Sequence, residues 1–313
     1  MSNKSNPVIS FIHPKKFGLI DIANALTEYG HINDKTRVYS SISNFKDLLK
    51  TLITNKNHKK TICIFWDNSL YSLNAMLVCA FFRVKILYYL HEPGGIGQKL
   101  YKGDPFIYSI KASIAEWLMK LISSKILVAR ADKLAFGDYY APLLYSQNRP
   151  YAKHNSKTIG FLGAKRDHRM HHVFERISSK LTESGYKIIY FPSSVYGKDI
   201  KDKVKFMEEC CAIWNCYGVP YNQSGVTGDC IASGVPCIVS KYEPFINDLE
   251  NLDLSVKIDI RLSDDDLALQ LIDILEKRMK AKIYFNNSKK ELASIYGGEL
   301  AFRKHWLKIF NSL

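Results

Sequence analysis

Short hydrophobic runs alternate along the chain with longer stretches in which hydrophobic residues recur at helical spacing. The short runs predict strands over residues 8–12, 38–39, 61–66, 85–90, 133–136, 158–162, 187–191, 212–217, 236–240 and 254–258. The longer stretches predict helices over residues 19–29, 45–54, 70–82, 107–128, 172–184, 198–210, 225–233 and 264–277. Because strands that alternate with helices are typical of parallel βαβ units, we expect an α/β protein.

One polar segment separates two such series of elements. Residues 146–157 (SQNRPYAKHNSK) contain almost no apolar side chain and include Pro150, a composition typical of linkers. The chain has 313 residues, enough for two domains of about 150 residues each. We therefore expect a first domain over residues 1–150 and a second over residues 151–313, and the last helix could pack back on the first domain.

The chain is basic, with 44 Lys and Arg against 30 Asp and Glu and a net charge of +14. Such charge suits nucleic acid, anionic lipid or phosphorylated substrates. No zinc finger, RNP-like motif or basic recognition helix accompanies it, so we do not expect a nucleic-acid partner. No run reaches the roughly 18 apolar residues of a membrane span, and no signal-peptide pattern is present, so we expect a cytoplasmic protein.

The predicted helix over residues 108–128 leaves two interpretations open. It interleaves Lys111, Lys120 and Lys125 with Trp117 and aliphatic residues at helical spacing. Cations beside an apolar stripe suit an anionic membrane surface, which would place the protein peripherally on the inner face of the cell membrane. An ordinary helix with its apolar face in the domain core fits the same pattern.

A polar, glycine-containing loop precedes the predicted helix over residues 225–233. Ligands of parallel α/β sheets bind where loops leave the carboxyl ends of strands. The free N–H groups of a helix start can bind a diphosphate, and the Ser224 hydroxyl can add a donor. The Asp229 carboxylate can accept hydrogen bonds from two vicinal ribose hydroxyls. The alternative is a capped helix without a ligand.

Residues 229–240 (DCIASGVPCIVS) resemble the E-A-M-A-x-G-x-P-V-I-x-S segment of GT-B glycosyltransferases, in particular of retaining family 4. This resemblance implies two Rossmann-like domains that face each other across a donor-binding cleft. In that family the glutamate of this segment holds the donor ribose, which implies the same role for Asp229. The loop before it contacts the donor diphosphate and sugar, which implies that role for Gln223, Ser224, Gly225 and Val226. The first glutamate of the family's E-x7-E motif falls on Tyr221 here, so the motif is degenerate.

A second segment resembles the same family. Residues 158–163 (TIGFLG) and the basic loop after them are similar to the first strand and loop of the GT-B C-terminal domain, where an Arg or Lys pair binds the donor diphosphate. The candidates that this implies are Gly163, Lys165, Arg166 and Arg169. Two cations can neutralise a leaving nucleoside diphosphate without a metal ion. A solvated basic turn is the alternative.

Two loops of the first half follow predicted strands and carry polar residues. GT-B enzymes have a histidine at the end of an equivalent strand, facing the donor sugar, which implies a catalytic role for His91 with Glu92 in support. A lone loop histidine can equally be structural. The residues expected on the acceptor side are His13, Lys16, Gly18, Gly94 and Gly95.

We expect no metal site. The acidic run of residues 264–266 follows Ser263 at a helix start, where Ser caps and carboxylates complement the helix dipole. The seven cysteines contain no CxxC pair, and their spacing does not match common zinc motifs.

These patterns together predict a metal-independent glycosyltransferase of bacterial surface polysaccharide biosynthesis, such as O-antigen or capsule. It would move a hexose-like sugar from a nucleotide-sugar donor, its substrate, to a glycan or lipid-diphosphate-linked acceptor, and would need no cofactor. Two alternatives stay open: a GT-B-fold nucleotide-sugar epimerase, and an inactive sugar-nucleotide-binding or scaffold subunit, which Tyr221 in the acidic motif would fit. Replacing Asp229 by Ala is expected to leave the fold intact.

Overall fold

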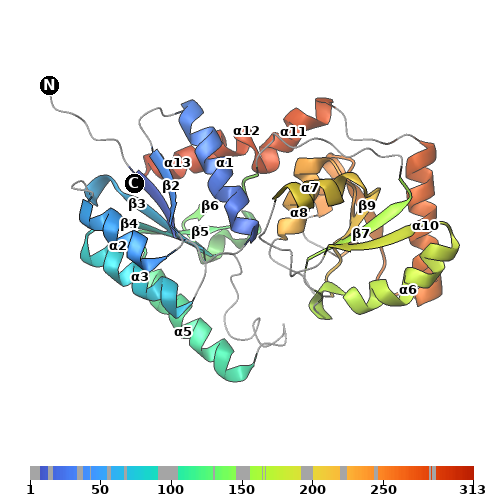
Figure 1. Cartoon of the computed structure of the whole chain (residues 1–313), viewed down its shortest axis with the longest axis horizontal. Coiled ribbons are helices and arrows are strands. Elements are labelled where there is room, and N and C mark those ends of the chain that lie inside the picture. Colours follow the sequence, from blue (N-terminus) through green and yellow to red (C-terminus); the bar gives the residue numbers. More distant parts are fainter. Residues whose placement is uncertain are drawn as a thin grey trace. The chain divides into compact units, whose positions relative to one another are not determined.

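The chain divides into two compact units, one formed by Met1–Ser146 with Gly297–Leu313 and the other by Gln147–Tyr296 (Figure 1). The computed structural model describes residues 8–12, 17–33, 38–42, 44–54, 58–66, 69–90, 105–129, 131–145, 156–163, 165, 167–191, 200–218, 224–242, 246–281, 283 and 287–313. The first segment of this unit ends at Ser146, the start of the polar segment 146–157, and its second segment is Gly297–Leu313. The range 151–313, expected as one domain, therefore includes a terminal segment of the first unit.

The first unit contains a parallel sheet in the order β2-β1-β3-β4-β5-β6. Its strands are β1 (Val8–Ile12), β2 (Val38–Ile42), β3 (Ile62–Phe65), β4 (Lys85–Leu90), β5 (Lys125–Val128) and β6 (Tyr139–Tyr140). The helices between them are α1 (Phe17–Asn33), α2 (Phe45–Thr54), η1 (His58–Lys60), α3 (Leu70–Phe81), α5 (Phe106–Ile122) and η2 (Ala131–Phe136). Strands β3 and β4 are almost completely buried, so hydrophobic side chains cover both faces of the sheet, as parallel sheets require.

The C-terminal segment completes the core of this unit. It contains α12 (Glu299–Ala301), the π-helical turn η4 (Phe302–Trp306) and α13 (Leu307–Asn311). Trp306 is fully buried against Trp66 and Tyr89, and its indole N–H donates to the Pro142 carbonyl at 2.9 Å. A Cβ atom at Gly297 would lie 2.5 Å from the Leu143 carbonyl oxygen, so only glycine allows this close approach. The last residues are therefore an integral part of the first unit.

The second unit contains a parallel sheet in the order β11-β10-β9-β7-β8. Its strands are β7 (Thr158–Leu162), β8 (Lys187–Phe191), β9 (Ala212–Trp214), β10 (Cys237–Ser240) and β11 (Ser255–Ile258). Its helices are η3 (Asp167–Arg169), α6 (His171–Glu183), α7 (Ile200–Glu208), α8 (Gly225–Ser233), α9 (Ile246–Asn251), α10 (Asp264–Lys280) and most of α11 (Asn287–Gly297). Alternating residues of β7 meet different helices: Phe161 packs with α6 and α10, whereas Gly160 faces Phe206 of α7 and Cys210 just after it.

Two predictions for the first unit were wrong. Residues 133–136 belong to the 3-10 helix η2, and the strand follows it at β6. Residues 107–128 do not form one helix, because α5 ends at Ile122 and Lys125–Val128 form β5 beside β4. Ser124 decides this break, since its backbone N–H donates to the Ile86 carbonyl at 2.8 Å and its hydroxyl accepts from the Ile86 N–H at 3.0 Å. Pairing with a distant strand overrides the helical pattern here.

Candidate functional site

The strand order of the second unit defines where a ligand would bind. β7 is the first strand of this sheet and lies between β8 and β9, so the connections that leave β7 and β9 run to opposite sides. Such a switch point leaves a crevice at the carboxyl ends of the two strands, where open α/β sheets bind their ligands. The loops that begin at Gly163 and Asn215 leave the sheet at this point. Gly163 has φ +112°, a backbone conformation that favours glycine.

A buried polar network joins the carboxyl end of β9 to the start of α8. The Tyr217 hydroxyl donates to Ser224 Oγ at 3.0 Å, and Ser224 Oγ donates to Asn215 Oδ1 at 2.9 Å. The Asn215 amide donates to Thr227 Oγ1 at 3.0 Å. All four side chains are buried. The network therefore fixes the first turn of α8 beside the switch point.

Ser224 is the N-cap residue of α8, but its side chain makes no capping hydrogen bond because the network engages it. The first N–H groups of a helix have no acceptor within the helix. A Cβ atom added at Gly225 would meet no described heavy atom within 4 Å, so the space beside this helix start is open among the described residues. Together with the helix dipole, these N–H groups suit an anion.

Arg169 lies at the same switch point and is 8% exposed. One of its terminal nitrogens donates to the Leu162 carbonyl at 2.8 Å, and its guanidinium carbon lies 5.3 Å from the Phe161 ring centre and 5.8 Å from that of Tyr217. Arg169 Nε is buried and has no hydrogen-bond partner among the described residues. An unsatisfied buried donor on a cation is costly unless a ligand accepts from it. Arg169 is therefore a preformed cationic group beside the α8 helix start.

Lys165 is turned toward α6 and β8. Its Nζ lies 2.5 Å from Glu175 Oε1 and 4.6 Å from the centre of the Tyr190 ring, and the side chain is 52% exposed. The hydrogen bond to Glu175 raises the pKa of Lys165, and the same bond lowers the pKa of Glu175. The structure thus separates two of the predicted cations, since Arg169 lies at the switch point and Lys165 forms a surface ion pair.

Asp229 is paired with a residue that the sequence did not single out. Lys203 Nζ lies 2.6 Å from Asp229 Oδ1, and the two side chains are 1% and 9% exposed. Asp229→Ala was expected to leave the fold intact, but the change would take a carboxylate away from the buried ammonium group of Lys203, so we now predict a loss of stability. A signal was present, since Lys203 precedes the buried Met207 and Cys210 at helical spacing. A lysine on the apolar stripe of a helix needs a buried partner.

Several predicted site residues lie outside the described residues, and one described residue lies in a different element from the one expected. The residues outside are His13, Lys16, His91, Glu92, Gly94, Gly95, Arg166 and Gln223. Gly18 lies in the first turn of α1, not in the loop before it. Val226 is buried in the first turn of α8, next to Gly225.

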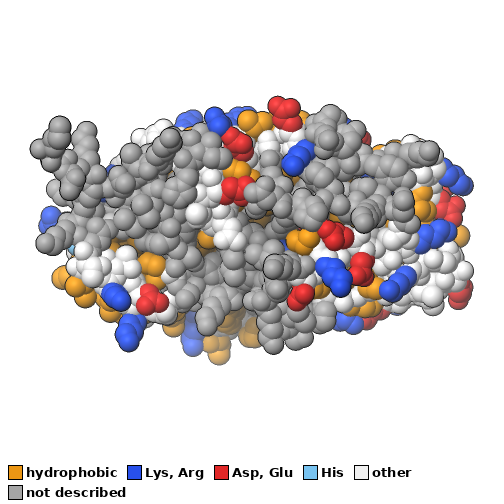
Figure 2. All heavy atoms as spheres, turned by 45° about the horizontal axis from the view of Figure 1, so that its top comes forward, with side chains coloured by type: hydrophobic (Ala, Val, Ile, Leu, Met, Phe, Trp, Pro, Cys, Tyr) orange, Lys and Arg blue, Asp and Glu red, His pale blue; other side chains and the backbone are white. Residues whose placement is uncertain are grey.

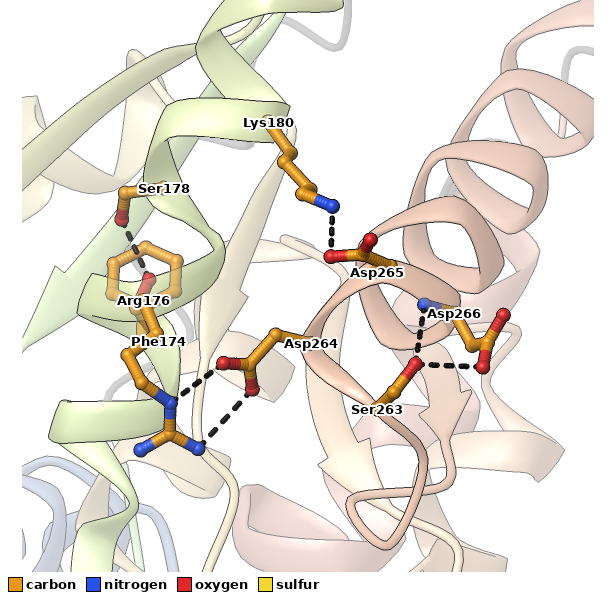
Figure 3. Close-up of polar contacts among 8 residues, drawn as sticks. All are labelled: Phe174, Arg176, Ser178, Lys180, Ser263, Asp264, Asp265 and Asp266. Carbon is orange, nitrogen blue, oxygen red and sulfur yellow. Dashed lines mark hydrogen bonds and ion pairs between the residues drawn. The ribbon is translucent and has the colours of Figure 1, made fainter.

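The acidic residues 264–266 form the first turn of α10 and have structural contacts there (Figure 3). Ser263 Oγ accepts from the Asp266 N–H at 3.2 Å, which confirms the predicted cap. Asp264 accepts two hydrogen bonds from Arg176 at 2.8 and 3.1 Å, and Asp265 pairs with Lys180, so both carboxylates join α10 to α6 (Figure 3). The bond to Arg176 lowers the pKa of Asp264. Among the described residues, no group of three His, Cys, Asp or Glu side chains could hold a metal ion.

Two Rossmann-like units, the second with a topological switch point between β7 and β9, define the class of fold. No protein-family model matches the sequence, and no curated protein matches it. Anabaena Alr3699/HepE, solved in complex with UDP, is similar in structure, with a TM-score of 0.63 and 10% identity over 98% of this chain and 100% of that one. Sucrose-phosphate synthase from Thermosynechococcus elongatus gives a TM-score of 0.59 and 9% identity over 98% and 100%. A Listeria monocytogenes protein assigned as a UDP-N-acetylglucosamine 2-epimerase gives 0.56 and 12% over 96% and 94%.

The chain therefore has the GT-B fold, as the resemblance predicted. At these identities the likeness concerns the fold alone. Glycosyltransferases and epimerases both occur among the similar structures, so the activity has to be argued from the residues of the site.

Proposed function

We propose that this protein is a glycosyltransferase that transfers a sugar from a nucleotide-sugar donor to an acceptor hydroxyl. The observation that carries the proposal is the juxtaposition of the buried Arg169, whose Nε has no partner among the described residues, with the polar network at the start of α8. A guanidinium and free helix N–H groups at one switch point are the donors that a diphosphate needs.

The donor is held by its nucleoside diphosphate. Arg169 and the first N–H groups of α8, at Gly225 and Val226, bind the diphosphate, and Arg166 adds a second cation from the same loop. Asp229 accepts from the ribose hydroxyls. UDP is the first nucleotide to test, because HepE was solved with UDP and with UDP-glucose.

Transfer breaks the bond between the anomeric carbon and the diphosphate oxygen, which leaves with the bonding electron pair. The acceptor hydroxyl oxygen forms the new bond to that carbon and loses its proton. The site accelerates this step by stabilising negative charge on the leaving diphosphate, so we propose that no metal ion is required. His91 faces the transferred sugar with Glu92 in support, and the residues on the acceptor side are His13, Lys16, Gly18, Gly94 and Gly95.

The acceptor is a glycan or a lipid-diphosphate-linked saccharide, and a face of the first unit supports the lipid-linked choice. Helices α3 and α5 pack together and expose large hydrophobic side chains. These are Leu70, Leu77, Phe81, Ile107, Ile114, Trp117 and Leu121, and they form the α3–α5 face. Figure 2 shows hydrophobic side chains on the surface in the lower left of the view, with Lys and Arg among them. No helix of the described residues is long and apolar enough to cross a membrane.

We propose that the α3–α5 face rests on a membrane that contains anionic lipids, to which the net charge of +14 is complementary. Lys111 lies among the exposed residues of α5. Lys120 pairs instead with the buried Glu116 at 2.8 Å, and Lys125 lies in β5 near Tyr139. The hydrophobic side chains therefore contribute most of the proposed attachment.

One experiment distinguishes sugar transfer from epimerisation of the donor and from nucleotide binding without reaction. The protein is incubated with UDP-glucose, UDP-N-acetylglucosamine, GDP-mannose or dTDP-rhamnose, with and without undecaprenyl-diphosphate-linked saccharides in anionic vesicles. Glycosylated lipid together with released nucleoside diphosphate supports the proposal. An epimerised donor without acceptor, as the epimerase among the similar structures would produce, contradicts transfer. Nucleotide binding without either product identifies an inactive binding subunit.

A further inference from the structure

Lys203 and Asp229 form an ion pair that protein encloses almost completely. Lys203 Nζ lies 2.6 Å from Asp229 Oδ1, and the lysine side chain is 1% exposed. Lys203 lies in the first turn of α7, and Asp229 lies one turn inside α8. Both helices start at the carboxyl edge of the second unit's sheet, since each follows a strand of that sheet. The pair therefore lies at the same end of the sheet as Arg169 and the polar network.

Stability alone does not explain this pair. Enclosing two charges has a large desolvation cost, and replacing such pairs by apolar residues often leaves a protein equally or more stable. A cation in the first turn of a helix also opposes the helix dipole. Met207 follows Lys203 on the same stripe of α7, and Cys210 follows just after the helix; both are buried, so an apolar side chain would suit the position of Lys203. The ion pair is instead the arrangement expected if the Asp229 carboxylate has to be held in one orientation.

We propose that Lys203 is a positioning residue of the donor site. It holds the Asp229 carboxylate in the orientation that accepts hydrogen bonds from the ribose hydroxyls, and it neutralises the negative charge of Asp229 beside the diphosphate. This inference rests on the proposed function. A diphosphate and an uncompensated carboxylate repel each other, so a cation on that carboxylate favours binding of the whole nucleotide. Lys203 supplies this cation from α7, the helix in contact with α8.

The test measures selectivity for ribose. Calorimetry gives the affinities of the full chain for UDP and 2′-deoxy-UDP, or for GDP and 2′-deoxy-GDP if GDP binds more tightly. The wild type is expected to prefer the ribonucleotide about tenfold, the effect of one hydrogen bond to a charged acceptor. Lys203→Met should bring this ratio close to one, and Lys203→Arg should restore most of it. Lys180→Met removes an exposed ion pair with Asp265 and serves as the matched control, with an unchanged ratio.

A double variant keeps the test valid if Lys203→Met fails to fold. Lys203→Met with Asp229→Asn removes both charges of the buried pair, so it should fold and bind inorganic pyrophosphate like the wild type, without selectivity for ribose. Lys203→Met that folds and keeps the wild-type ratio overturns the inference. A double variant with full selectivity overturns it too. If the wild type binds UDP but does not prefer the ribonucleotide, the role of Lys203 and Asp229 is refuted and the proposed function stands. If the wild type binds no nucleoside diphosphate, the proposed function itself is refuted.

Discussion

Replacing Asp229 by Ala should destabilise the second unit strongly. The change removes one partner of the 2.6 Å pair and leaves the ammonium group of Lys203, whose side chain is 1% exposed, without its carboxylate. Breaking a buried pair in this way costs about 3–5 kcal/mol, because the remaining charge stays desolvated and loses the attraction of the carboxylate. For a unit of about 150 residues each kcal/mol lowers the melting temperature by about 2–4 °C, so the expected decrease is about 6–20 °C.

The matched control is Asp265→Ala in the same unit. Asp265 also pairs with a lysine, Lys180, but its side chain is 70% exposed. Exposed pairs contribute about 0–1 kcal/mol, so the control should melt within a few degrees of the wild type. Differential scanning calorimetry of the full chain measures both changes in the transition of the second unit.

A second variant tests the cause of the effect. Adding Lys203→Met to Asp229→Ala removes both charges, so most of the lost melting temperature should return. If Asp229→Ala and Asp265→Ala melt at the same temperature, the pair is not buried in solution and the reasoning fails. If the double variant melts no higher than Asp229→Ala, the loss of stability has a cause other than the buried charge of Lys203.

The remaining predictions concern the ligand, the membrane and the helix cap. Arg169→Met should weaken UDP binding about tenfold or more by calorimetry in EDTA, where wild-type binding should persist; wild-type binding that needs magnesium contradicts the metal-independent proposal. Phe81→Ser with Trp117→Ser should reduce cosedimentation with anionic vesicles, whereas the control Leu269→Ser, which removes a side chain 65% exposed on α10, should not. Equal binding by the wild type, the double variant and the control contradicts attachment through the α3–α5 face. Ser263→Ala should lower the stability of the second unit by about 1 kcal/mol in thermal unfolding, and an unchanged transition would mean that the cap contributes nothing.

The sequence by itself determined the class of fold and most of its elements. The helices over residues 45–54 and 225–233 and the strands over residues 158–162 and 187–191 have the predicted bounds. Hydrophobic periodicity is local, and it shows which face of each element is buried. The loops after β7 and before α8 were also recognisable, because polar residues and glycines follow buried strands there.

Only the tertiary structure decided the partners of the charged residues. Lys165 and Arg169 belong to one basic loop, yet one forms a surface ion pair and the other lies buried against Leu162 and Tyr217. The pairing of Lys203 with Asp229 joins residues that are 26 positions apart and lie on different helices. In the same way, residues 125–128 became a strand because β4 lies beside them. Hydrophobic periodicity specifies whether a residue is buried. The partner of a buried charge depends on which elements pack together, and this packing is determined by contacts between segments far apart in the chain.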